Sequence, residues 1–75
     1  MVIEITLKNE FGEFKSIPIE VTAQEYEEII LLSKTFYTSG GYEIQTEQGF
    51  IVIPPEIVKK SILCLSIINY DDTTN

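Results

Sequence analysis

The residues of this chain that could do chemistry are carboxylates and one thiol, since the sequence contains no histidine. Ten Glu and two Asp occur along its 75 residues. A general acid/base pair needs two ionisable groups in a cleft with separated pKa values. Nearly all of these acids instead fall at predicted solvent-facing strand positions, turns, a helix start or the C-terminal tail. Glu27, Glu28 and a neighbouring acid could hold a divalent cation, but their spacing matches no EF-hand loop. We therefore predict no catalytic residue, no metal site and no cofactor.

The single thiol, Cys64, lies between Leu63 and Leu65 in an apolar run. Without a second cysteine or any histidine, an internal disulfide, a Cys–His pair and a zinc site of these ligands are impossible within one chain. Lys59 and Lys60 are the nearby cations that could activate the thiol. A thiol packed as a small hydrophobe is the simpler interpretation. With no G-x-S-x-G sequence and no phosphate-binding glycine loop either, we expect that the protein is not an enzyme.

The charge balance argues against several partners. Twelve acids and five lysines give a formal net charge of −7, and arginine is absent. Arginine is the usual reader of phosphate and guanine, and an acidic chain is repelled by phosphates, so direct nucleic-acid binding is not expected. No apolar run reaches the ~20 residues that span a bilayer, and no signal peptide is evident. The lone thiol suits a reducing compartment. We expect a cytoplasmic protein without membrane contact, and the use of Ile and Lys without Arg favours a low-GC bacterial or phage source.

The elements begin with a predicted hairpin. Residues 2–8 (VIEITLK) alternate in polarity as a half-buried strand does. After a turn over NEFGE, the segment KSIPIEV alternates again, with Ile17, Ile19 and Val21 facing inward. Pro18 cannot donate to a strand ladder, so this second strand is expected at a sheet edge or with a bulge.

A helix is predicted over residues 23–37. Thr22 and Glu25 have the T-x-x-E spacing of a capping box, and two glycines after Ser39 end the helix. One face carries its apolar and small side chains: Tyr26, Ile29, Ile30, Ser33, Phe36 and Tyr37. Leu31 and Leu32 fall outside this stripe. Leu31 lies on the polar side, between Glu27 and Glu28, and is either an isolated exposed leucine or a contact with another chain.

A second hairpin is predicted over residues 42–53, with a three-residue loop ending in Gly49. Its return strand, FIVI, is apolar on both parities, as in a strand covered on both faces. Residues 55–68 allow two interpretations. One is a single helix beginning at Pro55, and the other is a short helical turn followed by a strand. The isoleucine-rich sequence SILCLSIIN favours the turn and strand.

Together these elements predict an α+β fold: a small antiparallel sheet from two β-hairpins plus a C-terminal strand, with the amphipathic helix packed on one face. Residues 1–70 are expected to form one compact domain, and residues 71–75 a polar, disordered tail. A domain of this size has a marginal core. The segment 50–68 is apolar on more than one side, whereas one helix covers only one face of a sheet.

Some of this apolar surface therefore needs a second cover, either a partner protein or another copy of the chain in a homodimer. The candidate interface residues are Leu31, Leu32, Phe50, Ile51, Ile53, Ile62 and Leu63. The function that these features favour is a non-enzymatic, small acidic protein-binding module of the regulator or inhibitor type. Two alternatives stay open: an acidic nucleic-acid mimic that binds a basic protein, and a self-assembling structural subunit.

Overall fold

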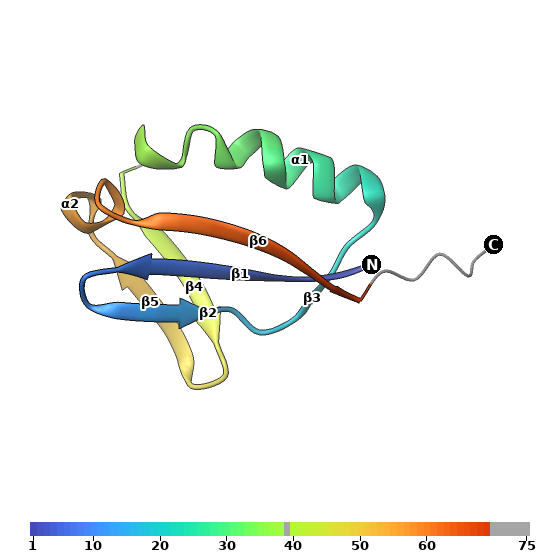
Figure 1. Ribbon diagram of the computed structural model, residues 1–75, viewed down its shortest axis with the longest axis horizontal. Coiled ribbons are helices and arrows are strands. Elements are labelled where there is room, and N and C mark those ends of the chain that lie inside the picture. The colour runs from blue at the N-terminus through green and yellow to red at the C-terminus, as the bar shows by residue number, and fades with distance from the viewer. Residues whose placement is uncertain (39, 70–75) are drawn as a thin grey trace.

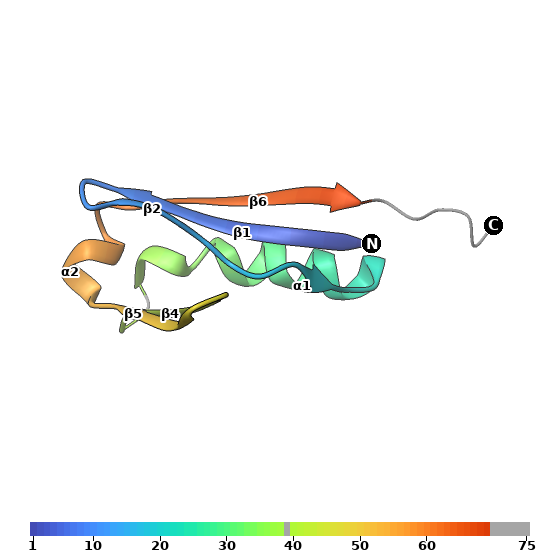
Figure 2. The same cartoon turned by 90° about the horizontal axis from the view of Figure 1, so that it is seen from below.

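The computed structural model describes residues 1–38 and 40–69, and it confirms the predicted α+β class. In chain order the elements are β1 (Val2–Asn9), β2 (Gly12–Lys15), β3 (Ile19–Glu20), α1 (Ala23–Ser33), the 3-10 helix η1 (Phe36–Thr38), β4 (Tyr42–Thr46), β5 (Gly49–Ile53), α2 (Pro55–Val58) and β6 (Ile62–Asn69). They form two layers (Figures 1 and 2). One layer is a main sheet of β1, β2, β3 and β6, and the other contains α1, α2 and the β4–β5 hairpin. The predicted tail, residues 71–75, lies outside the described residues.

The main sheet is built around β1, which pairs antiparallel with β2 and β3 on one side and with β6 on the other. Ile3 and Leu7 of β1 are fully buried, as the alternation predicts.

The second predicted strand, residues 15–21, forms only in part. Strand β2 begins at Gly12, inside the predicted turn, and shares only Lys15 with the predicted strand, whereas residues 16–18 around Pro18 separate it from β3. Both strands lie at a sheet edge, as Pro18 predicts. Ser16 fixes this interruption, because its Oγ accepts the Ile5 N–H (2.9 Å) and its own N–H donates to the Ile5 carbonyl (2.8 Å).

Helix α1 begins as predicted but ends earlier. Thr22 and Glu25 form both hydrogen bonds of the capping box. The helix stops at Ser33, four residues before the predicted end at 37. The physical reason is competition for the last carbonyls: Ser33 Oγ donates to the Ile29 carbonyl (2.7 Å), and Thr35 Oγ1 donates to the Leu32 carbonyl (2.9 Å). The chain then enters η1.

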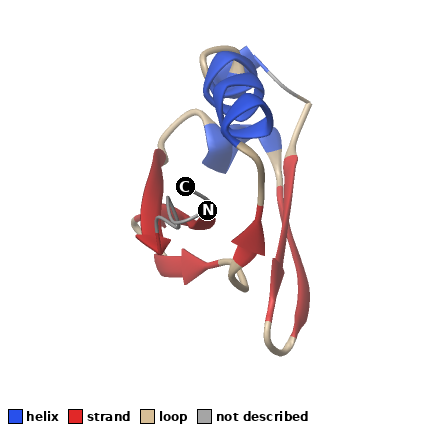
Figure 3. Ribbon diagram, turned by 90° about the vertical axis from the view of Figure 1, so that its right-hand side faces the viewer, coloured by secondary structure: helices blue, strands red, loops and turns tan. Residues whose placement is uncertain are grey.

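The second hairpin does not join the main sheet. Strands β4 and β5 form their own two-stranded sheet at one side of the molecule (Figure 3). A hydrogen bond from the Ile17 N–H to the Gln45 carbonyl (3.0 Å) links it to the main sheet. Gly49 pairs with Thr46, so the loop has two residues, Glu47 and Gln48, rather than the predicted three. Gly49 has a φ of +133°, which explains the glycine.

The prediction that β5 is covered on both faces is wrong. Phe50 and Val52 are 69% and 67% exposed, whereas Ile53 on the other parity is buried. The hairpin lies in the same layer as α1 and α2, so only the side of the hairpin that faces the main sheet meets the rest of the described chain.

For residues 55–68 the favoured interpretation is confirmed and the single-helix alternative is wrong. Pro55–Val58 is the short helix α2, and β6 follows it. Val58 is fully buried in a core cluster with Leu7, Phe36 and Ile53. Ser61 closes this corner, since its Oγ donates to the Ile57 carbonyl and accepts the Asn9 side-chain amide (3.2 Å). This cluster thus lies at one end of the molecule, where α2, η1 and the hairpin meet the main sheet, whereas the buried Ile3 and Val21 lie near β3.

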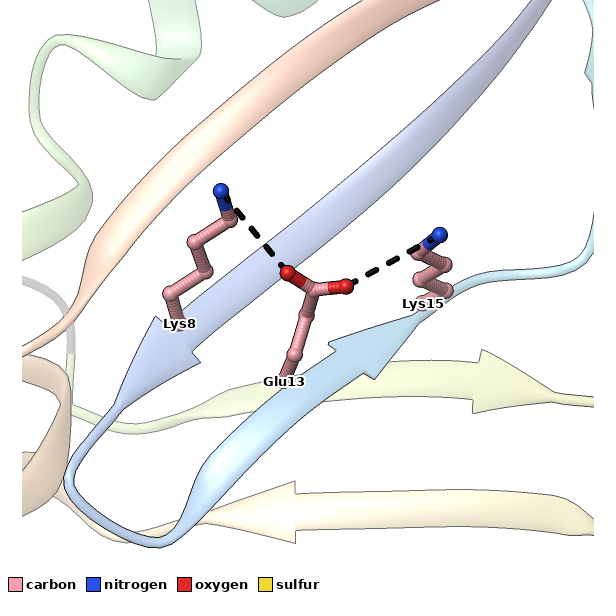
Figure 4. A network of polar contacts seen from close by, with 3 residues as sticks. All are labelled: Lys8, Glu13 and Lys15. Atoms are coloured by element: carbon pink, nitrogen blue, oxygen red, sulfur yellow. Dashed lines mark ion pairs between the residues drawn. The ribbon is translucent and has the colours of Figure 1, made fainter.

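The outer face of the main sheet is polar. Glu13 lies between Lys8 and Lys15, with one carboxylate oxygen 3.7 Å from each ammonium group (Figure 4). All three side chains are about half exposed, so these ion pairs contribute little to stability. This face is a solvated one. No helix in the described part of the chain is long and apolar enough to cross a membrane.

Candidate interaction surface

Strand β6 is an open edge of the main sheet. Within the described residues its strand partner is β1, in a register that runs from Lys8↔Ile62 to Ile3↔Ile67. The eight residues ILCLSIIN contain no charge and no proline. Proteins usually protect sheet edges with charged residues, prolines, bulges or short strands. The β2–β3 edge has such protection, because it is broken at Pro18 and carries Glu13 and Lys15. Most of β6 lacks it, its one irregularity being a register shift near the C-terminal end.

Two sets of side chains alternate along β6. Residues directly opposite each other in an antiparallel pair share a face. Three β6 residues lie opposite the inward-facing residues of β1 and therefore face the second layer: Leu63, Leu65 and Ile67. Cys64 lies opposite Thr6 and so faces the polar side, where it is half-buried. Any strand added beside β6 would present alternate side chains to the second layer.

Helix α1 runs alongside β6, on the side away from β1 and one layer below it (Figures 1 and 2). None of its eleven residues, all of which the structure describes, is buried. Of the predicted inner face, Phe36 is buried in η1, whereas Ile30 and Tyr37 are 36% and 48% exposed. The helix therefore flanks the open edge without sealing it.

A largely apolar groove of about 290 Å³ lies between α1 and the main sheet. Its lining comes from α1, η1 and the segment between them, and from β1, β4 and β6: Ile5, Ile29, Leu32, Ser33, Thr35, Phe36, Tyr42 and Leu63. Phe36 and Tyr42 pack edge to face with ring centroids 4.9 Å apart. None of the lining residues is an Asp, Glu, Lys or Arg. Burial raises the pKa of the Tyr42 phenol above its ordinary value.

The structure divides the predicted interface residues among separate locations. Leu32 and Leu63 line the groove. Leu31 is 65% exposed, close to the 71% of Leu32, but it does not line the groove. Ile62 is 61% exposed at the start of β6, on the polar face of the main sheet.

The remaining three predicted residues lie on β5, away from α1. Phe50 points outward from the hairpin beside Gln45, its cross-strand neighbour. Ile51 is half-buried and Ile53 is buried in the core, so both are engaged within the chain. The seven predicted residues do not form one continuous patch.

Sequence reasoning did not predict that Ile29, Phe36 and Tyr42 line a groove together. Ile29 and Phe36 belong to the predicted core face of the helix, and Tyr42 to the inner face of the hairpin. Their gathering around Leu63 depends on the early end of α1, which no sequence pattern indicated. The signal available in the sequence was the uncharged length of β6, beside a helix with two leucines off its apolar stripe.

Among residues 1–38 and 40–69, no group of three or more Cys, Asp or Glu side chains is arranged to hold a metal ion. A hollow of about 410 Å³ with a mixed polar and apolar lining lies between the main sheet and the hairpin tip, and Glu4, Glu13, Lys15 and Glu47 reach it. Glu13 is already paired with Lys15 there. The groove beside β6 is therefore the strongest candidate site.

No protein-family model matches this chain, and neither a curated protein nor a solved structure shows significant similarity to it.

Proposed function

We propose that this protein is a non-enzymatic protein-binding module that takes up an extended segment of a partner protein as an added strand on β6. The observation that carries the proposal is the uncharged edge of β6 lying open beside the apolar groove. Strand addition to a sheet edge is a common mode of peptide recognition, in which main-chain hydrogen bonds give affinity and side-chain pockets give specificity.

The expected energetics are those of a moderate binder. Each ladder hydrogen bond contributes about 0.5–1.5 kcal/mol net, and each buried side chain of Val or Leu size about 1.5–3 kcal/mol. Lost translational and rotational freedom, together with ordering of the segment, costs at least several kcal/mol. A segment of about eight residues is long enough to cover β6. We expect affinity of about micromolar strength, and an effect on the partner through occupancy, as in a regulator or inhibitor.

The test compares two adjacent leucines of similar exposure. Leu32→Lys places a charge in the groove, whereas Leu31→Lys places the same charge one position outside it. Each lysine would follow a glutamate by four residues, Glu28 or Glu27, so both substitutions favour the helix to a similar degree. The pair isolates the groove from general effects of charge and helix stability.

The three proteins are used as bait in a low-GC Gram-positive lysate at low and high salt, and captured proteins are identified by mass spectrometry. The proposal expects a stoichiometric partner bound by the wild type and Leu31→Lys, retained in high salt and lost with Leu32→Lys. A partner captured equally by both variants would refute the groove as its site. A basic partner lost in high salt from all three baits would favour the nucleic-acid mimic. Self-association abolished by Leu32→Lys would favour the self-assembling subunit.

A further inference from the structure

We infer that the segment taken up on β6 is positively charged, an extended peptide whose side chains facing the second layer are apolar beside the groove and Lys or Arg beside the N-terminal half of α1. This inference rests on the proposed function and names the chemistry of the partner. Strand β6 itself contributes no charge, so the charge of the ligand is selected by the surroundings of the groove.

Those surroundings are acidic along α1. Residues four apart on a helix lie on the same side, one turn from each other. Glu28 precedes Leu32 by four residues, and Glu25 precedes Ile29 by four. Both residues therefore extend the groove side of the helix toward its N-terminus, and both are exposed. Glu28 precedes the groove directly, and Glu25 keeps its charge while its Oε1 accepts the Thr22 N–H of the capping box (2.8 Å). The sequence of α1, AQEYEEIILLS, contains no cation.

The lysines lie toward the other end. Lys34 follows the C-terminus of α1, and Lys59 and Lys60 immediately precede β6. In Figure 1 the end of α1 and the start of β6 lie at the same side of the molecule, beside α2. The surface along β6 is thus polarised, with carboxylates beside the C-terminal half of the strand. Basic residues of the bound segment belong at that half, opposite Glu25 and Glu28.

The net charge of the chain disfavours the binding of a second copy of the chain in the groove. Two chains with a charge of −7 each repel one another at long range, whereas a basic segment is attracted and its association accelerated. A basic peptide therefore fits the electrostatics of this surface better than a homodimer does.

The experiment is an NMR titration of the 15N-labelled full chain with synthetic peptides, at neutral pH and low salt. The probe is acetyl-KTKTVTV-amide, whose Lys and Val side chains share one parity, so that in antiparallel addition the lysines lie beside the C-terminal half of β6. The charge-reversed control is acetyl-ETETVTV-amide. We expect the basic peptide to cause saturable shifts in β6 and α1 and to bind at least about fivefold more tightly than the acidic peptide, from two or more exposed ion pairs. High salt should reduce this ratio toward one. Leu32→Lys should weaken binding and Leu31→Lys should not.

Two further peptides test the strand itself. Each is the basic sequence with alternate amide nitrogens methylated, one set on each side of the backbone. In an added strand only one set of N–H groups faces β6, so one methylated peptide should lose binding and the other should retain it.

Each remaining outcome overturns a defined part of the reasoning. Equal affinity of the acidic and basic peptides would overturn the charge inference and leave strand addition intact. Equal binding of both methylated peptides would overturn strand addition and with it the proposed function. A failure of every peptide to shift β6 and α1 would overturn the inference. A dimer at low salt that Leu32→Lys dissociates would do the same, because a second copy would then occupy the groove.

Discussion

Replacement of Ser16 by alanine is expected to destabilise the fold by about 1–2 kcal/mol. Ser16 is only 7% exposed, and its Oγ accepts the Ile5 N–H and donates to the Ile17 carbonyl, both at 2.9 Å. Alanine leaves the Ile5 N–H without this acceptor at the break between β2 and β3. A buried N–H without an acceptor costs about 1–3 kcal/mol. The lower part of that range applies, because Ile5 is half-buried and water can reach it in part.

Urea unfolding followed by circular dichroism measures this cost. With a slope of about 1 kcal/mol per molar urea for a domain of this size, the midpoint should fall by roughly 1–2 M. The matched control is Ser33→Ala. The Ser33 hydroxyl donates to the Ile29 carbonyl within α1, and alanine is the better helix former by about 0.5 kcal/mol. Its midpoint should stay or rise. A Ser16→Ala midpoint equal to that of the wild type would refute the assigned role of this hydroxyl.

Two further predictions concern ionisation. The raised pKa of Tyr42 means that the unfolded chain loses the phenolic proton first as pH rises, so this group's stabilisation is present below about pH 10 and declines above it. Urea midpoints at about pH 8 and pH 10.5 should show a larger fall for the wild type than for Tyr42→Phe, and equal falls would contradict the burial of this phenol. Self-association should increase as pH approaches the isoelectric point near 4.3, where charge repulsion vanishes. Sedimentation velocity that finds the same mass at pH 7 and near the isoelectric point would contradict the protective role of the net charge.

Local patterns in the sequence predicted the elements whose structure depends on neighbours along the chain. The alternation in residues 2–8 and the capping box at Thr22 each depend on residues a few positions apart, and both are present in the structure. The edge position expected from Pro18 is also present, since β2 and β3 lie at a sheet edge. The favoured turn and strand after Pro55 also formed, since proline and β-branched residues have strong backbone preferences.

The differences arise where distant segments meet. The FIVI run predicts a strand covered on both faces. Phe50 and Val52 are nevertheless exposed, because the hairpin forms a separate two-stranded sheet beside the main sheet. Whether Leu31 or Leu32 lines the groove depends on the rotation of α1 about its own axis. That rotation follows from the end of α1 at Ser33 and the burial of Phe36. Helical periodicity grouped both leucines as outside the apolar stripe and could not distinguish them.

The acidic composition and the open edge are most simply understood together. An eight-residue, largely apolar edge strand such as β6 is a template for pairing with another copy of the chain. The opposite edge of the main sheet, β2–β3, is protected by Glu13 and Lys15 and by the interruption near Pro18. Charges within β6 would protect it but would also exclude a ligand strand. Carboxylates placed on α1 beside the edge repel another copy of the same acidic chain and still leave the backbone groups of β6 accessible to a cationic segment. Under the proposed function, the net charge of −7 would disfavour self-pairing of the edge and favour a basic partner at the same surface.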